Sequence, residues 1–152
     1  MAKEFSFADL NKEMSKISEY GNTLDKSTIS EIDHYIPTGN YHLNACLTGS
    51  LFGGYPNNRA VALAGPSGTG KTYLILNAIK QAQRQGYSII FYDSENAVDK
   101  KLVEKFGIDA SKFRYEPCNT VQEFRSSVTA ITDVLIEQKK KGIELPKIMV
   151  VL

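Results

Sequence analysis

GPSGTGKT at residues 65–72 is the most informative stretch of the sequence, because it matches the phosphate-loop pattern G-x-x-x-x-G-K-[ST]. The apolar run RAVALA (59–64) precedes it and predicts a buried strand, and residues 71–85 follow with apolar side chains on one helical face. A triphosphate requires backbone N–H donors around its oxygens, which small side chains and a tight turn allow. The strand–loop–helix context therefore predicts nucleotide binding rather than an accidental glycine-rich turn.

Two residues of this loop have roles that follow from phosphate chemistry. Lys71 is long enough to reach the β and γ phosphates, and the hydroxyl of Thr72 is suited to bind Mg²⁺. The N-terminus of the following helix adds a partial positive charge beside the phosphates. We predict that the whole loop holds the nucleotide: Gly65, Pro66, Ser67, Gly68, Thr69, Gly70, Lys71 and Thr72.

Strands and helices alternate on the C-terminal side of the loop. This alternation predicts an α/β fold with right-handed crossovers and a mostly parallel sheet flanked by helices. Continuously apolar strands agree, because parallel sheets are covered on both faces. The predicted elements are a strand at 87–92, a helix at 98–106, a strand at 112–116, a long helix that the capping box Thr120–Glu123 opens and the run 139–142 ends, and a strand at 147–152.

The residues before the loop predict a separate N-terminal segment that is smaller than the main domain. Apolar residues recur at spacings of 3, 4 and 3 over 7–20, which predicts a helix. We divide the chain into an N-terminal arm, 1–50, and a main domain, 51–152. The other predicted pieces of the arm and its boundary are an extended segment at 31–36, one or two helical turns at 41–47 and a loop rich in Gly, Pro and Asn at 49–58.

Composition and charge exclude several classes of protein. The chain has 152 residues, 42% of them hydrophobic and 23% charged, which is typical of one globular domain and excludes low-complexity disorder. The net charge is +1, so no basic footprint for nucleic acid extends over the whole chain. Cys46 and Cys118 form no disulfide framework and no zinc spacing. Since the start is polar and no apolar run reaches roughly 20 residues, we expect a soluble cytoplasmic protein without membrane partners.

Carboxylates follow the predicted strand 87–92 at Asp93 and Glu95. Because ligands bind beyond the carboxyl ends of the strands in open α/β sheets, both lie on the edge where the phosphate loop is expected. A carboxylate there can polarise the water that attacks a γ-phosphate. Both lie on one side of an extended stretch, so geometry leaves the choice between them open. The alternative is structural, since Asp93 or Ser94 would suit the cap of the helix at 98–106.

Further stretches of the sequence resemble the RecA-type recombinases, and more closely the UvsX-like recombinases of bacteriophages. The most specific pieces are FYDSE (91–95) and FGID (106–109). The resemblance implies a RecA-like ATPase core that uses ATP and Mg²⁺. The matching stretches are IPTGNYHLNACLTG (36–49), VALAGPSGTGKT (61–72), IIFYDSENAVD (89–99), FGIDASKFRYEP (106–117) and KIMVVL (147–152).

The resemblance also assigns roles to residues outside the loop. Glu95 falls where the family keeps the glutamate that activates water and senses the γ-phosphate, and Asp99 falls near the adenine. Tyr73 replaces a small residue, so it would either stack on the nucleotide or pack. Leu102 stands where bacterial RecA has an aromatic that stacks on the base, which puts that stacking in doubt here.

The function that the resemblance implies is DNA recombination and repair. Members of the family are ATPases that coat single-stranded DNA, self-associate into filaments through the N-terminal arm and exchange strands. In the family, the counterpart of 147–152 continues into an Asp that orders Mg²⁺, and the DNA loops follow. We therefore expect a chain truncated at its C-terminus before both features, which contacts DNA mainly through regions beyond Leu152. If a phage encodes it, the bacterial host's cytoplasm is its expected location.

Other functions remain compatible with a phosphate loop. Another RecA-fold motor, such as a hexameric helicase, would form rings instead of filaments. A nucleoside or nucleotide kinase is disfavoured because about 64 residues precede the loop. The isolated chain would work as a non-hydrolysing nucleotide-binding fragment if it lacks the metal carboxylate, and little hydrolysis is expected of it.

Overall fold

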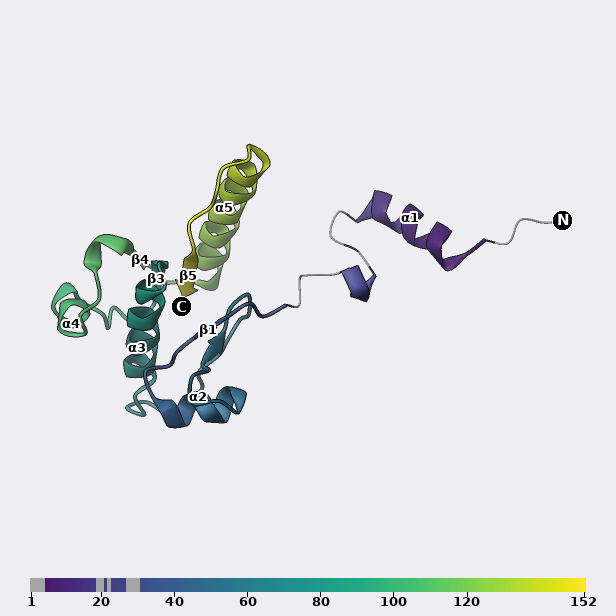
Figure 1. Ribbon diagram of the computed structural model, residues 1–152. Coiled ribbons are helices and arrows are strands. Elements are labelled where there is room, and N and C mark those ends of the chain that lie inside the picture. The colour runs from purple at the N-terminus through teal and green to yellow at the C-terminus, as the bar shows by residue number, and fades with distance from the viewer. Residues whose placement is uncertain (1–4, 19–20, 22, 27–30) are drawn as a thin grey trace. The chain divides into compact units, whose positions relative to one another are not determined.

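The computed structural model describes residues 5–18, 21, 23–26 and 31–152 (Figure 1). It divides the chain into two compact units, Met1–Asp33 and His34–Leu152. The second unit contains the phosphate loop and every predicted site residue. The predicted boundary at residue 50, between an N-terminal arm that would mediate self-association and the main domain, stays a prediction.

In the first unit, the described residues form one helix and one short 3-10 turn. Helix α1 spans Phe7–Ile17 and begins at a capping box, in which Ser6 and Asp9 bond to each other's backbone N–H groups. The helix expected over 7–20 is confirmed as a helix, but it ends at Ile17, and residues 19 and 20 lie outside the described residues. The turn η1 spans Leu24–Lys26.

The second unit is built on a three-stranded parallel sheet, which confirms the predicted fold class. Strand β3 (Ser88–Asp93) lies in the centre, between β4 (Phe113–Pro117) and β5 (Ile148–Val151). Both pairings are parallel, and Phe91 lies opposite Tyr115 on one side and Val151 on the other. All three strands therefore end at the same edge of the sheet.

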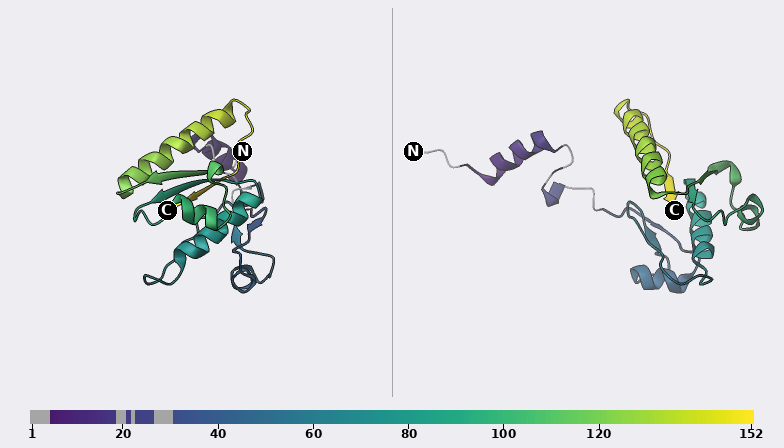
Figure 2. Two further views of the ribbon diagram at one scale, coloured as in Figure 1. Left: turned by 90° about the vertical axis from the view of Figure 1, so that its left-hand side faces the viewer. Right: turned by 180° about the vertical axis from the view of Figure 1, so that it is seen from behind.

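Helices cover both faces of this sheet because β3 sends alternate side chains to opposite sides. Ile89 and Phe91 pack into one core with helix α3 (Lys71–Arg84) and helix α4 (Lys100–Lys105). Ile90 and Tyr92 pack on the other face against Phe124, Val128 and Ile131 of helix α5 (Val121–Lys140). Figure 2 shows α5 and α3 on opposite sides of the strands.

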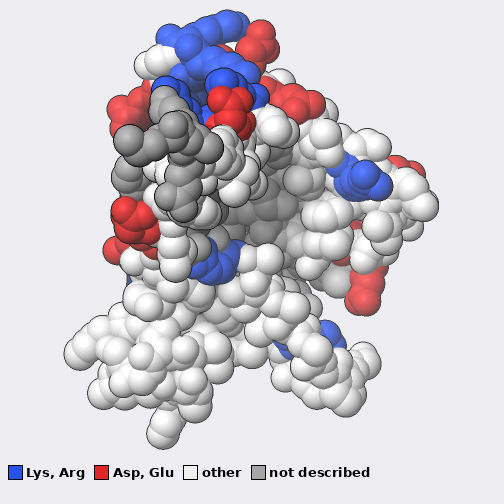
Figure 3. Space-filling model, turned by 90° about the vertical axis from the view of Figure 1, so that its right-hand side faces the viewer, with Lys and Arg blue, Asp and Glu red and all other residues white. Residues whose placement is uncertain are grey.

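Helix α5 begins and ends as its sequence predicts. Thr120 and Glu123 form the capping box, and Lys141 at the C-terminal end pairs with Glu137 at 3.6 Å. Cations suit this end of a helix dipole. Figure 3 shows Lys and Arg side chains beside Asp and Glu side chains on the face in view. The run 139–142 therefore ends α5, as predicted.

Two expectations for the segments around the loop are wrong. Residues 59–64 form no strand, and most of them are exposed; only Leu63 packs against the core. A strand needs a neighbour that accepts and donates its backbone hydrogen bonds, and no strand in the described ranges pairs with 59–64. The segment 49–58 is not all loop, because β2 (Tyr55–Pro56) pairs antiparallel with β1 (Tyr35–Ile36).

Two further elements complete the unit. Helix α2 spans Tyr41–Thr48, as predicted for 41–47, and ends at Gly49 in the left-handed conformation. A 3-10 turn, η2, spans Ala110–Lys112 and leads into β4. No helix in the described part of the chain is long and apolar enough to cross a membrane.

Candidate functional site

The phosphate loop has the backbone that its glycines predict. Gly68 and Gly70 have φ of 77° and 87°, in the left-handed region that other residues rarely adopt. A Cβ at either position would meet nothing within 4 Å, so conformation rather than space requires glycine there. The Thr69 hydroxyl donates to the carbonyl of Pro66 at 2.9 Å and closes the turn.

Lys71 folds back over this loop. Its Nζ donates to the carbonyl oxygens of Gly65 and Pro66, each at 2.9 Å. The ammonium charge is therefore held at the loop by two exposed, neutral acceptors, which a charged phosphate oxygen can replace. Helix α3 begins at Gly70 without a side-chain cap, so its first N–H groups have no side-chain acceptor. Together, these features form a cradle for an anion.

Thr72 and Tyr73 follow in the first turn of α3. Thr72 is exposed and supplies the hard hydroxyl oxygen that Mg²⁺ prefers. The Tyr73 ring packs edge-on against Phe106, with 5.4 Å between centroids, yet 61% of the residue is exposed. Packing is thus observed for Tyr73, and its contact with a nucleotide stays a prediction.

Asp93 is buried at the end of β3, with 6% of its surface exposed. Its carboxylate accepts hydrogen bonds from the backbone N–H of Glu95 at 3.1 Å, from that of Val98 at 3.0 Å and from the Tyr115 phenol at 3.2 Å. Burial raises the pKa of this carboxyl, but the donated hydrogen bonds outweigh burial and hold the pKa below its ordinary value. Asp93 is therefore committed, as an anion, to holding the turn.

The turn that Asp93 holds presents Glu95 to solvent. Glu95 and the residues beside it, Ser94 and Asn96, are exposed. Of the two carboxylates after β3, only that of Glu95 is free of such structural hydrogen bonds within residues 31–152. No hydrogen bond or ion pair in that range joins it to the phosphate loop. The structure thus leaves Glu95 as the candidate base without testing the role.

The helix after this turn is capped differently from expectation. Helix α4 begins at Lys100 rather than 98, and Asp99 is its N-cap, accepting from the backbone N–H of Leu102 at 2.7 Å. Neither Asp93 nor Ser94 caps the helix. The reason is that the Asp93 carboxylate already accepts from two backbone N–H groups of the turn and from Tyr115 of β4, whereas Asp99 directly precedes the first helical residue. The predicted contact of Asp99 with adenine stays a prediction.

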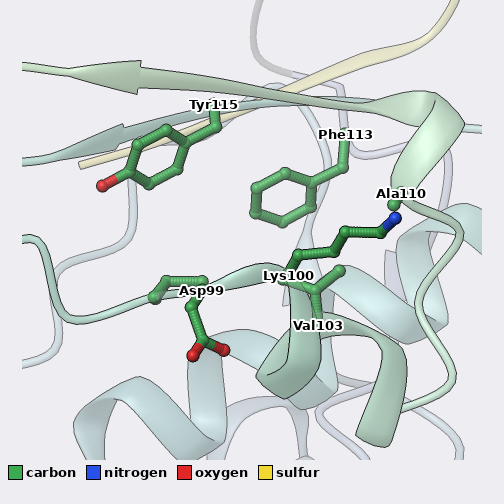
Figure 4. A pocket seen from close by; sticks show the side chains of 7 residues that line it. Asp99, Lys100, Val103, Ala110, Phe113 and Tyr115 are labelled. Atoms are coloured by element: carbon green, nitrogen blue, oxygen red, sulfur yellow. The ribbon is translucent and has the colours of Figure 1, made fainter.

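A pocket of about 370 Å³ lies between α4 and β4 (Figure 4). Figure 4 shows the rings of Phe113 and Tyr115 above the start of α4, with the Asp99 carboxylate directed away from both rings. The pocket walls are mainly apolar. The complete lining is Val98, Asp99, Lys100, Val103, Ala110, Phe113 and Tyr115.

The residues present fit a triphosphate with Mg²⁺. The loop supplies backbone donors and a cation, and Thr72 supplies one oxygen ligand, with phosphate oxygens and water as the usual remaining ligands of Mg²⁺. In the described ranges, no group of three or more His, Cys, Asp or Glu side chains forms a separate metal site.

Tyr115 is not among the site residues that the sequence predicts. Its strand was predicted, but its contact with Asp93 depends on the parallel register that places Tyr115 opposite Phe91. A register between strands joined by a helical crossover has no local signal. Alternation along the strand indicates only which face a side chain takes.

Stability should depend on the ionisation of Asp93. Because its folded-state pKa is lowered, its contribution is fully present above the unfolded pKa of about 3.9 and is lost as pH falls through the lower folded value. We expect Asp93→Asn to lower the free energy of unfolding by about 1–3 kcal/mol at pH 7 and to weaken its acid dependence. Urea denaturation of the chain at pH 7 and below pH 4 measures both effects.

The matched control for this measurement is Asp133→Asn, at an exposed position on α5. It should leave the free energy of unfolding at pH 7 nearly unchanged. An Asp93→Asn chain as stable as the parent at pH 7 would contradict the anchoring role.

Comparisons with known proteins show which family this chain resembles. The profile of the RecA N-terminal domain matches residues 3–140. The protein RecA of Lactobacillus delbrueckii subsp. bulgaricus is 32% identical over 127 residues, which cover 81% of this chain and 38% of the relative. The protein RecA of Acholeplasma laidlawii is 34% identical over 110 residues, which cover 71% of this chain and 31% of the relative. The chain thus spans about a third of the length of the curated relatives it matches.

Proposed function

The chain belongs to the RecA N-terminal domain family, and from this premise we propose that it is the ATP-binding N-terminal part of an ATP-dependent DNA recombinase. In the intact protein, the activity would be a DNA-dependent ATPase that forms filaments on single-stranded DNA and promotes homologous pairing and strand exchange. The family match over residues 3–140 favours a recombinase over a nucleoside or nucleotide kinase.

The observation that carries the proposal is the arrangement of positive charge and hydrogen-bond donors at the phosphate loop. The Nζ of Lys71 lies on the carbonyls of Gly65 and Pro66, at the uncapped start of α3. A positive charge and free N–H groups at one point favour a polyanion. Bound ATP with Mg²⁺ supplies the phosphoryl group that is transferred to water.

The proposed role of each residue follows from its position. Lys71 and the loop N–H groups hold the phosphates, and Thr72 holds Mg²⁺. Glu95 orients the attacking water and takes its proton, since it is the solvent-facing carboxylate after β3. Tyr73 and Asp99 would contact the nucleoside part, as the resemblance to the family implies.

The finer family assignment and the partners are also proposals. The stretches at 36–49 and 89–99 support a likeness to the phage UvsX-like recombinases. Residues 1–50 would mediate self-association, and α1 supports this with apolar side chains that are exposed within its own unit, Phe7 at 72% and Ile17 at 88%. Single-stranded DNA would be bound mainly by regions beyond residue 152. The proposed site of action is the cytoplasm, of a bacterial host if a phage encodes the protein.

Single-stranded DNA should stimulate ATP hydrolysis by the intact protein that contains this chain. We expect turnover to rise at least about tenfold when DNA is added, because a filament on DNA would complete the catalytic geometry. Steady-state phosphate release with and without single-stranded DNA measures the effect, and electron microscopy distinguishes filaments from rings. DNA-independent turnover by ring-shaped particles would contradict a recombinase and favour another RecA-fold motor.

A further inference from the structure

The turn that carries Glu95 is tied at both of its ends by one side chain from the neighbouring strand. The phenol oxygen of Tyr115 lies 3.2 Å from a carboxylate oxygen of Asp93 and 3.3 Å from the side-chain carbonyl of Asn96. Asp93 precedes Glu95 and Asn96 follows it. The phenol therefore joins the two residues that bracket the candidate base.

The backbone of this turn needs such support. Asn96 has φ of 52°, in the left-handed region that a residue other than glycine occupies at a cost and that surrounding contacts must stabilise. The Asp93 carboxylate supplies part of this support by accepting from the N–H groups of Glu95 and Val98. Tyr115 adds the link from β4, a strand that pairs with β3 in parallel and whose Phe113 stacks on Phe91 at 5.5 Å.

We propose that Tyr115 is a positioning residue for Glu95, acting through Asp93 and Asn96 at the turn after β3. The inference rests on the proposed ATPase function. The hydroxyl of Tyr115 contacts Asp93 and Asn96 and makes no hydrogen bond to Glu95 within residues 31–152. Tyr115 holds the backbone from which the Glu95 side chain projects, so its hydroxyl affects turnover and not nucleotide affinity.

The chemistry of the phenol suits this role. Burial, and then the charge of Asp93, raise the pKa of Tyr115 above its ordinary value. The hydroxyl consequently keeps its proton at neutral pH and donates it to one oxygen at a time.

The test is Tyr115→Phe in the intact, DNA-stimulated protein, because this change removes only the hydroxyl. We expect kcat for ATP hydrolysis to fall about ten- to a hundredfold, the effect of misplacing a catalytic group, while KM for ATP and the affinity for single-stranded DNA stay unchanged. Tyr92→Phe is the matched control. It removes a phenol hydroxyl from β3 that bonds Ser127 at 2.7 Å on the opposite face of the sheet, and kcat should not change.

A second variant separates positioning from general stability. When Glu95→Gln is already present, adding Tyr115→Phe should lower kcat no further, because the phenol acts through Glu95. An additional tenfold loss in the double variant would overturn the inference. So would wild-type kcat in Tyr115→Phe alongside strong loss in Glu95→Gln, an outcome that leaves the proposed function standing. A parent protein without DNA-stimulated turnover would overturn the proposed function, and the inference with it.

Discussion

Replacement of Lys71 by Ala should abolish tight ATP binding while the fold persists. The side chain carries the cation of the phosphate loop, and each charge-assisted contact to a phosphate contributes about 1.5–3 kcal/mol. Two such contacts correspond to a loss of affinity of roughly a hundredfold or more, since 1.4 kcal/mol is tenfold. Isothermal titration of the intact protein with ATP measures the dissociation constant directly.

The fold should tolerate this change because of what Lys71 bonds in the absence of ligand. Its two acceptors are exposed backbone carbonyls, which water can satisfy after the side chain is removed. Lys141→Ala is the charge-matched control, since it removes a lysine at the far end of α5 that pairs with Glu137. Unchanged ATP affinity in Lys71→Ala would contradict the assignment of the loop.

The second large effect is expected for Glu95→Gln, which should bind ATP normally and turn it over about 10²–10⁴ times more slowly. The amide has the shape of the carboxylate but cannot take a proton from water. The backbone N–H of Glu95, which bonds to Asp93, is kept, so the turn should retain its conformation. Single-turnover phosphate release together with the ATP dissociation constant separates chemistry from binding.

Glu104→Gln provides the control for charge. It removes an exposed carboxylate from α4 that pairs with Lys100 at 3.6 Å, and turnover should remain at the parent level. If Glu95→Gln also turned over at the parent rate, the base would have to lie elsewhere. The buried, hydrogen-bonded anion of Asp93 is a poor substitute, because its lowered pKa weakens it as a base.

Much of the fold followed from local patterns. The capping box at Thr120 and the glycine after α3 mark helix ends through backbone bonding that only nearby residues supply. The apolar stretch in β3 is buried on both faces, as a parallel sheet requires. The run at 59–64 has the same apolar character and yet forms no strand. Apolar composition favours burial, but a strand exists only where another strand pairs with it.

The candidate site likewise has residues that local sequence patterns predicted and residues that only the fold distinguishes. The loop pattern predicted the tight, glycine-rich turn and the place of Lys71, because a phosphate cradle is made from consecutive residues. The choice between Asp93 and Glu95 was open in the sequence, since both follow one strand at alternate positions. Burial and three donated hydrogen bonds now distinguish Asp93 as the anchor of the turn.

The sequence by itself therefore determined the phosphate loop, the alternation of strands and helices and the parallel class of the sheet. Each of these depends on residues close together in the chain. The contact of Tyr115 with the turn of Glu95 is known only from the three-dimensional fold. The cause is the parallel register between β3 and β4, which sets which side chains meet and brings together Asp93 and Tyr115, 22 positions apart in the chain.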